Sequence, residues 1–144
     1  MGNSWHPFTS GYTLLFLFLS LLFNTSSSFR DGSYRDYNVV EFEKEGGIPN
    51  KHDYDTQLHN GQVLNNTLNS LEAGDLFYIK NKTYHLIGGI IASDIHDVII
   101  KIDGTLLFSD ERETWPTDEN GEVLEAIMLY KIKNVVFTSS GMGT

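Results

Sequence analysis

The chain has 144 residues, enough for one domain, and carries 10 basic residues against 19 acidic ones. The resulting net charge of −9 should repel nucleic acid and anionic lipid, so we expect neither as a partner. The absence of cysteine excludes a disulfide framework and a thiolate metal site, so stability must come from packing and hydrogen bonds.

An apolar run near the start of the chain, Leu14 to Phe23, indicates a secretory signal peptide. The run is too short for a membrane-spanning helix, which needs roughly 20 residues. Small residues at Ser26 and Ser28 offer a cleavage site before Phe29. The residues before the run include no Lys or Arg, which leaves an uncleaved anchor or a wrongly assigned gene start as alternatives. We expect residues 1–28 to be the signal peptide of a secreted, extracellular protein with no membrane contact after cleavage.

Secretion would make two Asn-x-Thr sequences acceptors for N-linked glycans. They begin at Asn65 (NNT) and Asn81 (NKT). A third such sequence, at Asn24 (NTS), lies within the predicted signal peptide and would be removed with it.

The next segments predict a linker, a strand and a helix. Residues 29–37 are polar, mixed in charge and without periodicity, which indicates a linker. The segment from Asn38 to Glu43 has strand composition and is followed by a break containing Gly and Pro. From Asp55 to Glu72, four leucines fall mostly at helical spacing, although Gly61 and four asparagines lower the helix propensity.

Three β-rich runs later in the chain repeat one another: DLFYIKN from Asp75, DVIIKID from Asp97 and NVVFTSS from Asn134. The first two starts are 22 positions apart and the last two 37, of which 17 belong to an acidic segment from Ser109 to Glu125. Units of about 20 residues with one inserted loop predict an all-β solenoid of stacked parallel strands. The residues expected in its interior include Ile99, Ile102, Leu106 and Val136.

A solenoid has further structural consequences. The helix from Asp55 should cover the first unit, because a terminal unit needs its own cap. Val98 to Ile100 should run beside Val135 to Phe137 in the same direction. The strand after Asn134 should have an unpaired edge, which would make the chain prone to associate edge to edge.

The acidic segment raises the question of a catalytic or metal site, because paired carboxylates serve both purposes. Its position between two repeat units, and its turn sequences Trp115-Pro116 and Asn120-Gly121, favour a solvated loop. A calcium site and a catalytic pair remain alternatives. The carboxylates are Asp110, Glu111, Glu113, Asp118, Glu119, Glu122 and Glu125. The histidines His52, His59, His85 and His96 lack metal-ligand spacing, and no cofactor is expected.

Three segments in order resemble the pectin lyase-like proteins. NVVEFEKEGGIPNKHDYDT and LFYIKNKTYHLIGGI are similar to the first two segments of that superfamily. DVIIKIDGTLLFSDERETWP, with IKNVVFTSSGMGT, is similar to rungs of the polygalacturonase-type glycoside hydrolases. The resemblance covers residues 38–144. It implies a right-handed parallel β-helix with an N-terminal capping helix, and hydrolysis of pectic or related polysaccharides with inversion at the anomeric carbon.

The catalytic groups of that family lie on rungs after the GxGT segment, which here ends at Thr144. The chain has no Asn-x-Asp, Asp-Asp or Gly-His-Gly sequence, and Lys131-Ile132-Lys133 precedes the place of the family's cationic cluster. No catalytic residue is therefore assigned. We expect the N-terminal fragment of a secreted polygalacturonase-like hydrolase, inactive alone, whose full-length form acts on a polysaccharide. The alternatives are a complete short β-helical carbohydrate-binding or adhesion module and a fragment of a β-helix polysaccharide lyase.

Overall fold

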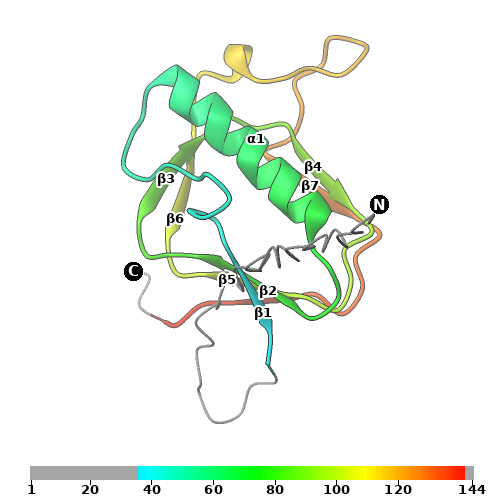
Figure 1. Cartoon of the computed structure of the whole chain (residues 1–144). Coiled ribbons are helices and arrows are strands. Elements are labelled where there is room, and N and C mark those ends of the chain that lie inside the picture. The colour runs from blue at the N-terminus through cyan, green and yellow to red at the C-terminus, as the bar shows by residue number, and fades with distance from the viewer. Residues whose placement is uncertain (1–35, 142–144) are drawn as a thin grey trace, which may run out of the picture.

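The computed structural model describes residues 36–141, within which eight short strands and one α-helix form parallel sheets covered by the helix (Figure 1). The predicted signal peptide, residues 1–28, and residues 29–35 of the predicted linker lie outside the described residues. The elements are β1 (Asn38–Glu41), α1 (Tyr54–Ser70), β2 (Asp75–Ile79), β3 (Thr83–Leu86), β4 (Ile90–Ser93), β5 (Ile99–Ile102), β6 (Thr105–Phe108), the 3-10 turn η1 (Arg112–Thr114), β7 (Ile127–Tyr130) and β8 (Val136–Thr138).

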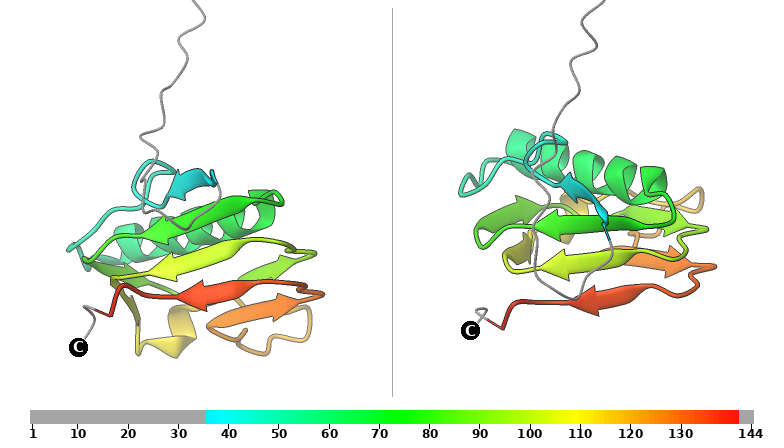
Figure 2. Two further views of the ribbon diagram at one scale, coloured as in Figure 1. Left: turned by 90° about the horizontal axis from the view of Figure 1, so that it is seen from below. Right: turned by 60° about the horizontal axis from the view of Figure 1, so that its bottom comes forward.

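The strands form three sheets, and the strand pairs within them are all parallel. The largest sheet has the order β1-β2-β5-β8, and the others are β3-β6 and β4-β7. The chain visits the three sheets in β2, β3 and β4 (coil 1), again in β5, β6 and β7 (coil 2), and then returns to the first sheet in β8. Figure 2 shows these layers below one another, with α1 beside coil 1. The prediction that Val98–Ile100 runs beside Val135–Phe137 in the same direction is confirmed, because Ile99 pairs with Val136 in parallel.

The Asp and Asn residues of the repeats mark a sharp corner before each strand of the largest sheet. The strand register aligns Gly74, Asp97 and Asn134, which have φ angles of 95°, 56° and 53°. Gly, Asn and Asp adopt this left-handed conformation more readily than other residues. The alignment of Asp75 with Asp97 from the sequence is therefore wrong by one residue. Asp75 lies one step later and accepts a hydrogen bond of 2.7 Å from Asn38 Nδ2.

Alternate side chains of the strands form a common apolar interior. Its buried members are Phe42, Leu64, Leu68, Phe77, Ile79, Tyr84, Leu86, Ile90, Ala92, Ile95, Val98 and Ile100. Of the residues predicted there, Ile102 and Leu106 pack against this core. The placement of Ile99 and Val136 in the interior is wrong. Ile100 and Val135 contact the core instead, because a shift of one residue along a strand reverses the face that a side chain occupies.

Helix α1 confirms the predicted helix of Asp55 to Glu72, with slightly different ends. Its N-cap is Asp53, whose carboxylate accepts hydrogen bonds from the Thr56 backbone N–H and hydroxyl. The Thr56 hydroxyl is the main cause that lowers the pKa of Asp53 to about 2. Gly61 allows a close approach to coil 1, because a Cβ atom there would lie 3.1 Å from the carbonyl oxygen of Ile87.

The asparagines of α1 pair with the free edges of β3 and β4. Asn60, which is fully buried, donates from Nδ2 to the carbonyl oxygen of His85 at 3.0 Å. Asn65 Oδ1 accepts from the N–H of Ile91 at 2.8 Å, and Asn69 Nδ2 donates to the carbonyl oxygen of Ile91 at 2.9 Å. These strands pair with coil 2 on one side only, so the helix supplies hydrogen-bond partners on the other. This arrangement is a cap for coil 1.

The opposite side of the stack is open within the described residues. Strands β6, β7 and β8 each have one neighbour, so the predicted unpaired edge after Asn134 is confirmed there. Phe137 is 54% exposed, whereas Phe77 and Ile100 in the same row of the largest sheet are 0% and 2% exposed. Interior side chains are thus uncovered at this end, which we call the open end.

We expect Asn60→Ala to destabilise the chain by roughly 2–4 kcal/mol, because Ala cannot replace the bonds to Ile48 and His85 and leaves buried backbone groups unpaired. The measurement is urea-induced unfolding followed by circular dichroism. The control is Asn66→Ala on the exposed side of the same helix, which should be neutral or slightly stabilising through its helix propensity. Equal losses in the two variants would contradict the proposed role of Asn60 in the cap.

Candidate functional site

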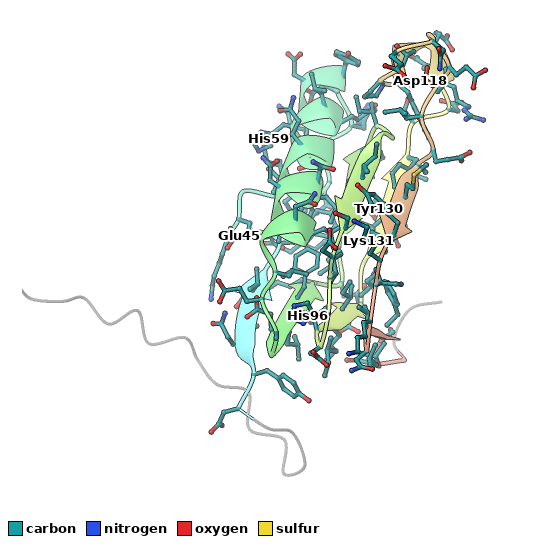
Figure 3. All side chains as sticks on the ribbon, turned by 90° about the vertical axis from the view of Figure 1, so that its right-hand side faces the viewer. Glu45, His59, His96, Asp118, Tyr130 and Lys131 are labelled. Carbon is teal, nitrogen blue, oxygen red and sulfur yellow. The ribbon has the colours of Figure 1, made fainter. Side chains whose placement is uncertain are left out.

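The acidic segment from Ser109 to Glu125 leaves coil 2 between β6 and β7, where an inserted loop was predicted. Its first half is anchored on coil 1. Trp115 is 8% exposed and packs where a Cβ atom of Gly88 would be, and Pro116 lies 2.8 Å from the Cβ position of Gly89. Two glycines therefore make room for the base of the segment, while its tip extends away from the sheets (Figure 3).

The carboxylates of this segment either accept hydrogen bonds within a turn or face solvent. Asp118 closes the tip by accepting hydrogen bonds from the N–H groups of Asn120 and Glu122 at 2.9 and 2.8 Å. The hydrogen bond from the Glu122 N–H is the main cause of the lowered pKa of Asp118. A carboxyl group with a lowered pKa is suited to accepting hydrogen bonds in a turn rather than to donating a proton. The other carboxylates of the segment lie on its exposed surface.

Two hollows of about 360 Å³ adjoin this segment. The first lies between α1 and the turn that joins β3 to β4, and its lining has no acidic, basic or histidine side chain. The second lies under the segment and is lined by Phe108, Ser109, Asp110, Arg112, Trp115, Glu125 and Ala126. The Arg112 guanidinium lies 5.4 Å from the Trp115 ring centre, which ties the segment together by a cation–π contact.

The outer face of the largest sheet carries a polar cluster, the sheet-face cluster. Its members are Glu41, Lys44, Tyr78, Lys80, Lys101, Asp103 and Ser140. The strand register places Glu41, Tyr78 and Lys101 in one row across β1, β2 and β5. Glu41 pairs with Lys44 at 2.8 Å and with Lys80 at 2.7 Å, and Lys101 Nζ lies 5.2 Å from the Tyr78 ring centre. An aromatic ring and three ammonium groups therefore share one surface.

Asp103 anchors one side of the sheet-face cluster and is only 7% exposed. Its carboxylate accepts hydrogen bonds from the Ser140 N–H at 2.6 Å and the Ser140 hydroxyl at 2.9 Å, and it also bonds the Tyr78 side chain. Burial acts to raise the pKa of Asp103, but these donors together outweigh it and the pKa is lowered. The next residue must be Gly104, because a Cβ atom there would collide with the carbonyl oxygen of Lys80.

The residues of the sheet-face cluster were not identified as site candidates from the sequence. The feature of the sequence that could have identified them is the alternation within the β-rich runs. Tyr78 and Lys80 are two positions apart, as are Lys101 and Asp103, and residues at this spacing in a strand lie on the same face. The alternation shows that such residues share a face. It does not show which strands lie beside one another.

The histidines come from separate turns and elements, and the structure brings two of them together, with the His52 and His85 ring centres 5.8 Å apart. His59 Nε2 is 3.0 Å from the carbonyl oxygen of Gly46, and His96 Nδ1 is 3.1 Å from an Asp97 carboxylate oxygen. Across residues 36–141, no group of three or more His, Asp or Glu side chains is arranged to hold a metal ion. In the same range, no helix is long and apolar enough to cross a membrane.

The two predicted glycan acceptors occupy different environments. Asn81 is exposed in the turn between β2 and β3. Asn65 is half-buried on α1, where its side-chain oxygen bonds the N–H of Ile91. Occupancy of both acceptors remains a prediction.

Comparison with known protein families, curated proteins and solved structures finds no match for this chain. What can be said of its function therefore rests on its own residues and geometry. These define a β-rich protein of parallel sheets, one face of which carries an aromatic ring among lysine and carboxylate side chains.

We expect Asp103→Asn to destabilise the chain by roughly 1–3 kcal/mol at pH 7, because the amide cannot accept all the hydrogen bonds that the carboxylate accepts. The pKa of Asp103 is lower in the folded protein than in the unfolded chain, where it is about 4. The stabilisation by the Asp103 carboxylate is therefore complete above about pH 4 and is lost as the pH falls through the pKa of Asp103 in the folded protein. Urea unfolding at several pH values should therefore show that the difference in free energy of unfolding between the wild type and Asp103→Asn becomes smaller below about pH 4. The control Asp110→Asn, at an exposed carboxylate, should change little. A difference in free energy of unfolding that does not change with pH would contradict this role of the Asp103 charge.

Proposed function

We propose that the chain forms the N-terminal coils of a right-handed parallel β-helix of the pectin lyase-like type and belongs to a secreted polygalacturonase-like glycoside hydrolase. The observation that carries the proposal is the return of the chain to the same three parallel sheets, with α1 capping coil 1. The segments that resemble the family fall on successive coils of this stack. The substrate class is then a pectic or related polysaccharide.

The sheet-face cluster supports this substrate class. A polymer of uronic acids carries a carboxylate and several hydroxyl groups on each sugar. The ammonium groups of Lys80 and Lys101 can attract such carboxylates, and the Tyr78 ring offers a flat surface beside them. Because Lys80 pairs with Glu41 and the whole chain is acidic, binding at this face should be weak.

Hydrolysis requires more than this face supplies. Inversion needs an acid for the leaving oxygen and a base for water, with their carboxyl groups held roughly 6.5–9.5 Å apart. The buried carboxylate Asp103 is held ionised by Ser140 and Tyr78, and the acidic segment presents its carboxylates to solvent. We infer that this chain binds polysaccharide without cleaving it, and that the catalytic groups of the enzyme belong to later coils.

The purified chain should migrate more slowly through a gel containing polygalacturonate than through a plain gel, and should release no reducing sugar from polygalacturonate. Replacing Lys80 and Lys101 together by Ala should reduce the retardation, because it removes the ammonium groups beside Tyr78. Lys51→Ala is the matched control, since Lys51 is an exposed lysine that pairs with Asp53 near the start of α1.

Other outcomes of this experiment would change the proposed function. Turnover that disappears in an Asp110→Ala, Glu111→Ala, Glu113→Ala variant would place an active site in the acidic segment. Retardation by a neutral glycan, with none by polygalacturonate, would favour a carbohydrate-binding module.

Expression in a eukaryotic secretory host should yield protein that begins at Phe29 and carries glycans at Asn65 and Asn81, because the apolar run and the small residues after it form a signal peptide. N-terminal sequencing and glycopeptide mapping are the measurements. An intact Met1 on the recovered protein would contradict cleavage, and protein retained in the membrane fraction would support the uncleaved anchor.

A further inference from the structure

We propose that the first sugar of a glycan on Asn65 lies in the hollow between α1 and the turn that joins β3 to β4, which we call the helix-side hollow. N-linked glycans begin with an N-acetylated amino sugar, so the inference gives this hollow a ligand of stated chemistry. It rests on the secretion of the chain proposed above, because N-glycans are attached to secreted chains. It is independent of the proposed polysaccharide substrate.

The side-chain amide of Asn65 has one atom in the cap and one atom free. Its Oδ1 accepts the hydrogen bond from the Ile91 N–H, which holds the side chain at the edge of β4. Asn60 and Asn69 bond carbonyl oxygens through their Nδ2 groups, whereas Asn65 Nδ2 makes no hydrogen bond within residues 36–141. Asn65 also lines the helix-side hollow. Because glycosylation modifies Nδ2 and leaves Oδ1 an amide oxygen, Asn65 can carry a glycan and keep its bond in the cap.

The lining of the helix-side hollow suits a neutral sugar. The hollow has a volume of about 360 Å³, and small-molecule sites usually start at roughly 300 Å³. Its lining has no charged side chain, so it offers nothing that would select an ionic ligand. Amide and backbone groups can bond the hydroxyl and acetamido groups of an amino sugar, and apolar carbons can contact its ring and methyl group. The polar members include Gln62, Asn66 and Gly88, and the apolar members include Leu58, Ile87 and Pro116.

The burial of Thr67 sets the order of events. Thr67 is the third residue of the acceptor sequence, which is recognised through its Asn and its Thr. In the folded chain Thr67 is 3% exposed, and its hydroxyl donates to the Val63 carbonyl oxygen at 2.8 Å. The acceptor is therefore accessible before α1 packs onto coil 1, and folding then closes the helix-side hollow around a sugar that is already attached.

The transfer needs a donor, which is an oligosaccharide carried on a lipid pyrophosphate. Asn65 Nδ2 forms a bond to C1 of the first sugar while the C1–O bond to the pyrophosphate breaks. The lipid pyrophosphate leaves with the electron pair of that bond, and Nδ2 loses one proton. No oxidant or reductant takes part.

The test compares the glycans on Asn65 and Asn81 within one molecule, made by expressing the full chain in a eukaryotic secretory host. A peptide N-glycanase hydrolyses the side-chain amide of a glycosylated Asn and leaves Asp, so mass spectrometry of peptides gives the release at each residue. In the folded protein, release at Asn65 should be at least about tenfold slower than at Asn81, since Asn81 lies in an exposed turn and release at Asn65 requires local opening. After denaturation in urea, the two glycans should be released at similar rates.

Two variants separate the effect of the helix-side hollow from that of the helix alone. Gln62→Trp, at an exposed position in the lining, fills the hollow and should raise the rate of release at Asn65 about tenfold, to that at Asn81. Asp55→Trp, at an exposed position of α1 outside the lining, is the matched control and should leave the rate unchanged. Both variants should keep the circular dichroism spectrum of the wild type.

The contrary outcomes are distinct from one another. A glycan on Asn81 with none on Asn65 would overturn the inference and leave the secretion of the chain in place, whereas no glycan on either residue would overturn both. Equal release from the two residues in the folded protein would place the Asn65 sugar in solvent. Slow release that Gln62→Trp does not change would assign the protection to the helix instead of the hollow. Either of these results overturns the inference, and neither depends on binding or cleavage of a polysaccharide.

Discussion

The structure depends on how a stack of parallel strands ends, because every terminal strand leaves backbone donors and acceptors on one edge. At coil 1 this requirement is met by side-chain amides of α1, with Asn60, Asn65 and Asn69 bonded to β3 and β4. A helix of better intrinsic propensity could not make these bonds. The asparagines thus cost helix stability and provide the coil with its cap.

The corners of the coils impose a second constraint that repeats along the chain. A strand that turns sharply into the next sheet needs a residue with positive φ, which Gly74, Asp97 and Asn134 provide. Asn134 Nδ2 also donates to Asp97 Oδ1 at 2.8 Å, so the side chains that fit the corner also link neighbouring coils. The repeat in the sequence is therefore a repeat of corners as much as of strands.

The surfaces that the coils leave exposed determine what the chain can bind. The coils direct apolar side chains inward and leave Tyr78, Lys80 and Lys101 on the outer face of the largest sheet. The acidic segment is held aside by Trp115 and Pro116 against two glycines, so it does not cover that face. A flat polar face is suited to an extended polymer, whereas the uncovered apolar interior at the open end is suited to a further layer of strands.

Composition and periodicity are local, so the sequence alone determined some of the elements and their order: the strand from Asn38, the helix near Asp55 and the three β-rich runs exist where they were expected. Strands β3, β4, β6 and β7 were not predicted individually. The sequence also determined that the acidic segment is an insertion. Only the tertiary structure decided the register, which shifted the Asp75 alignment by one residue and turned Ile99 and Val136 outward. It likewise decided that Tyr78, Lys101 and Asp103 meet, since they lie on two strands whose pairing is fixed by hydrogen bonds between coils and not by any local preference.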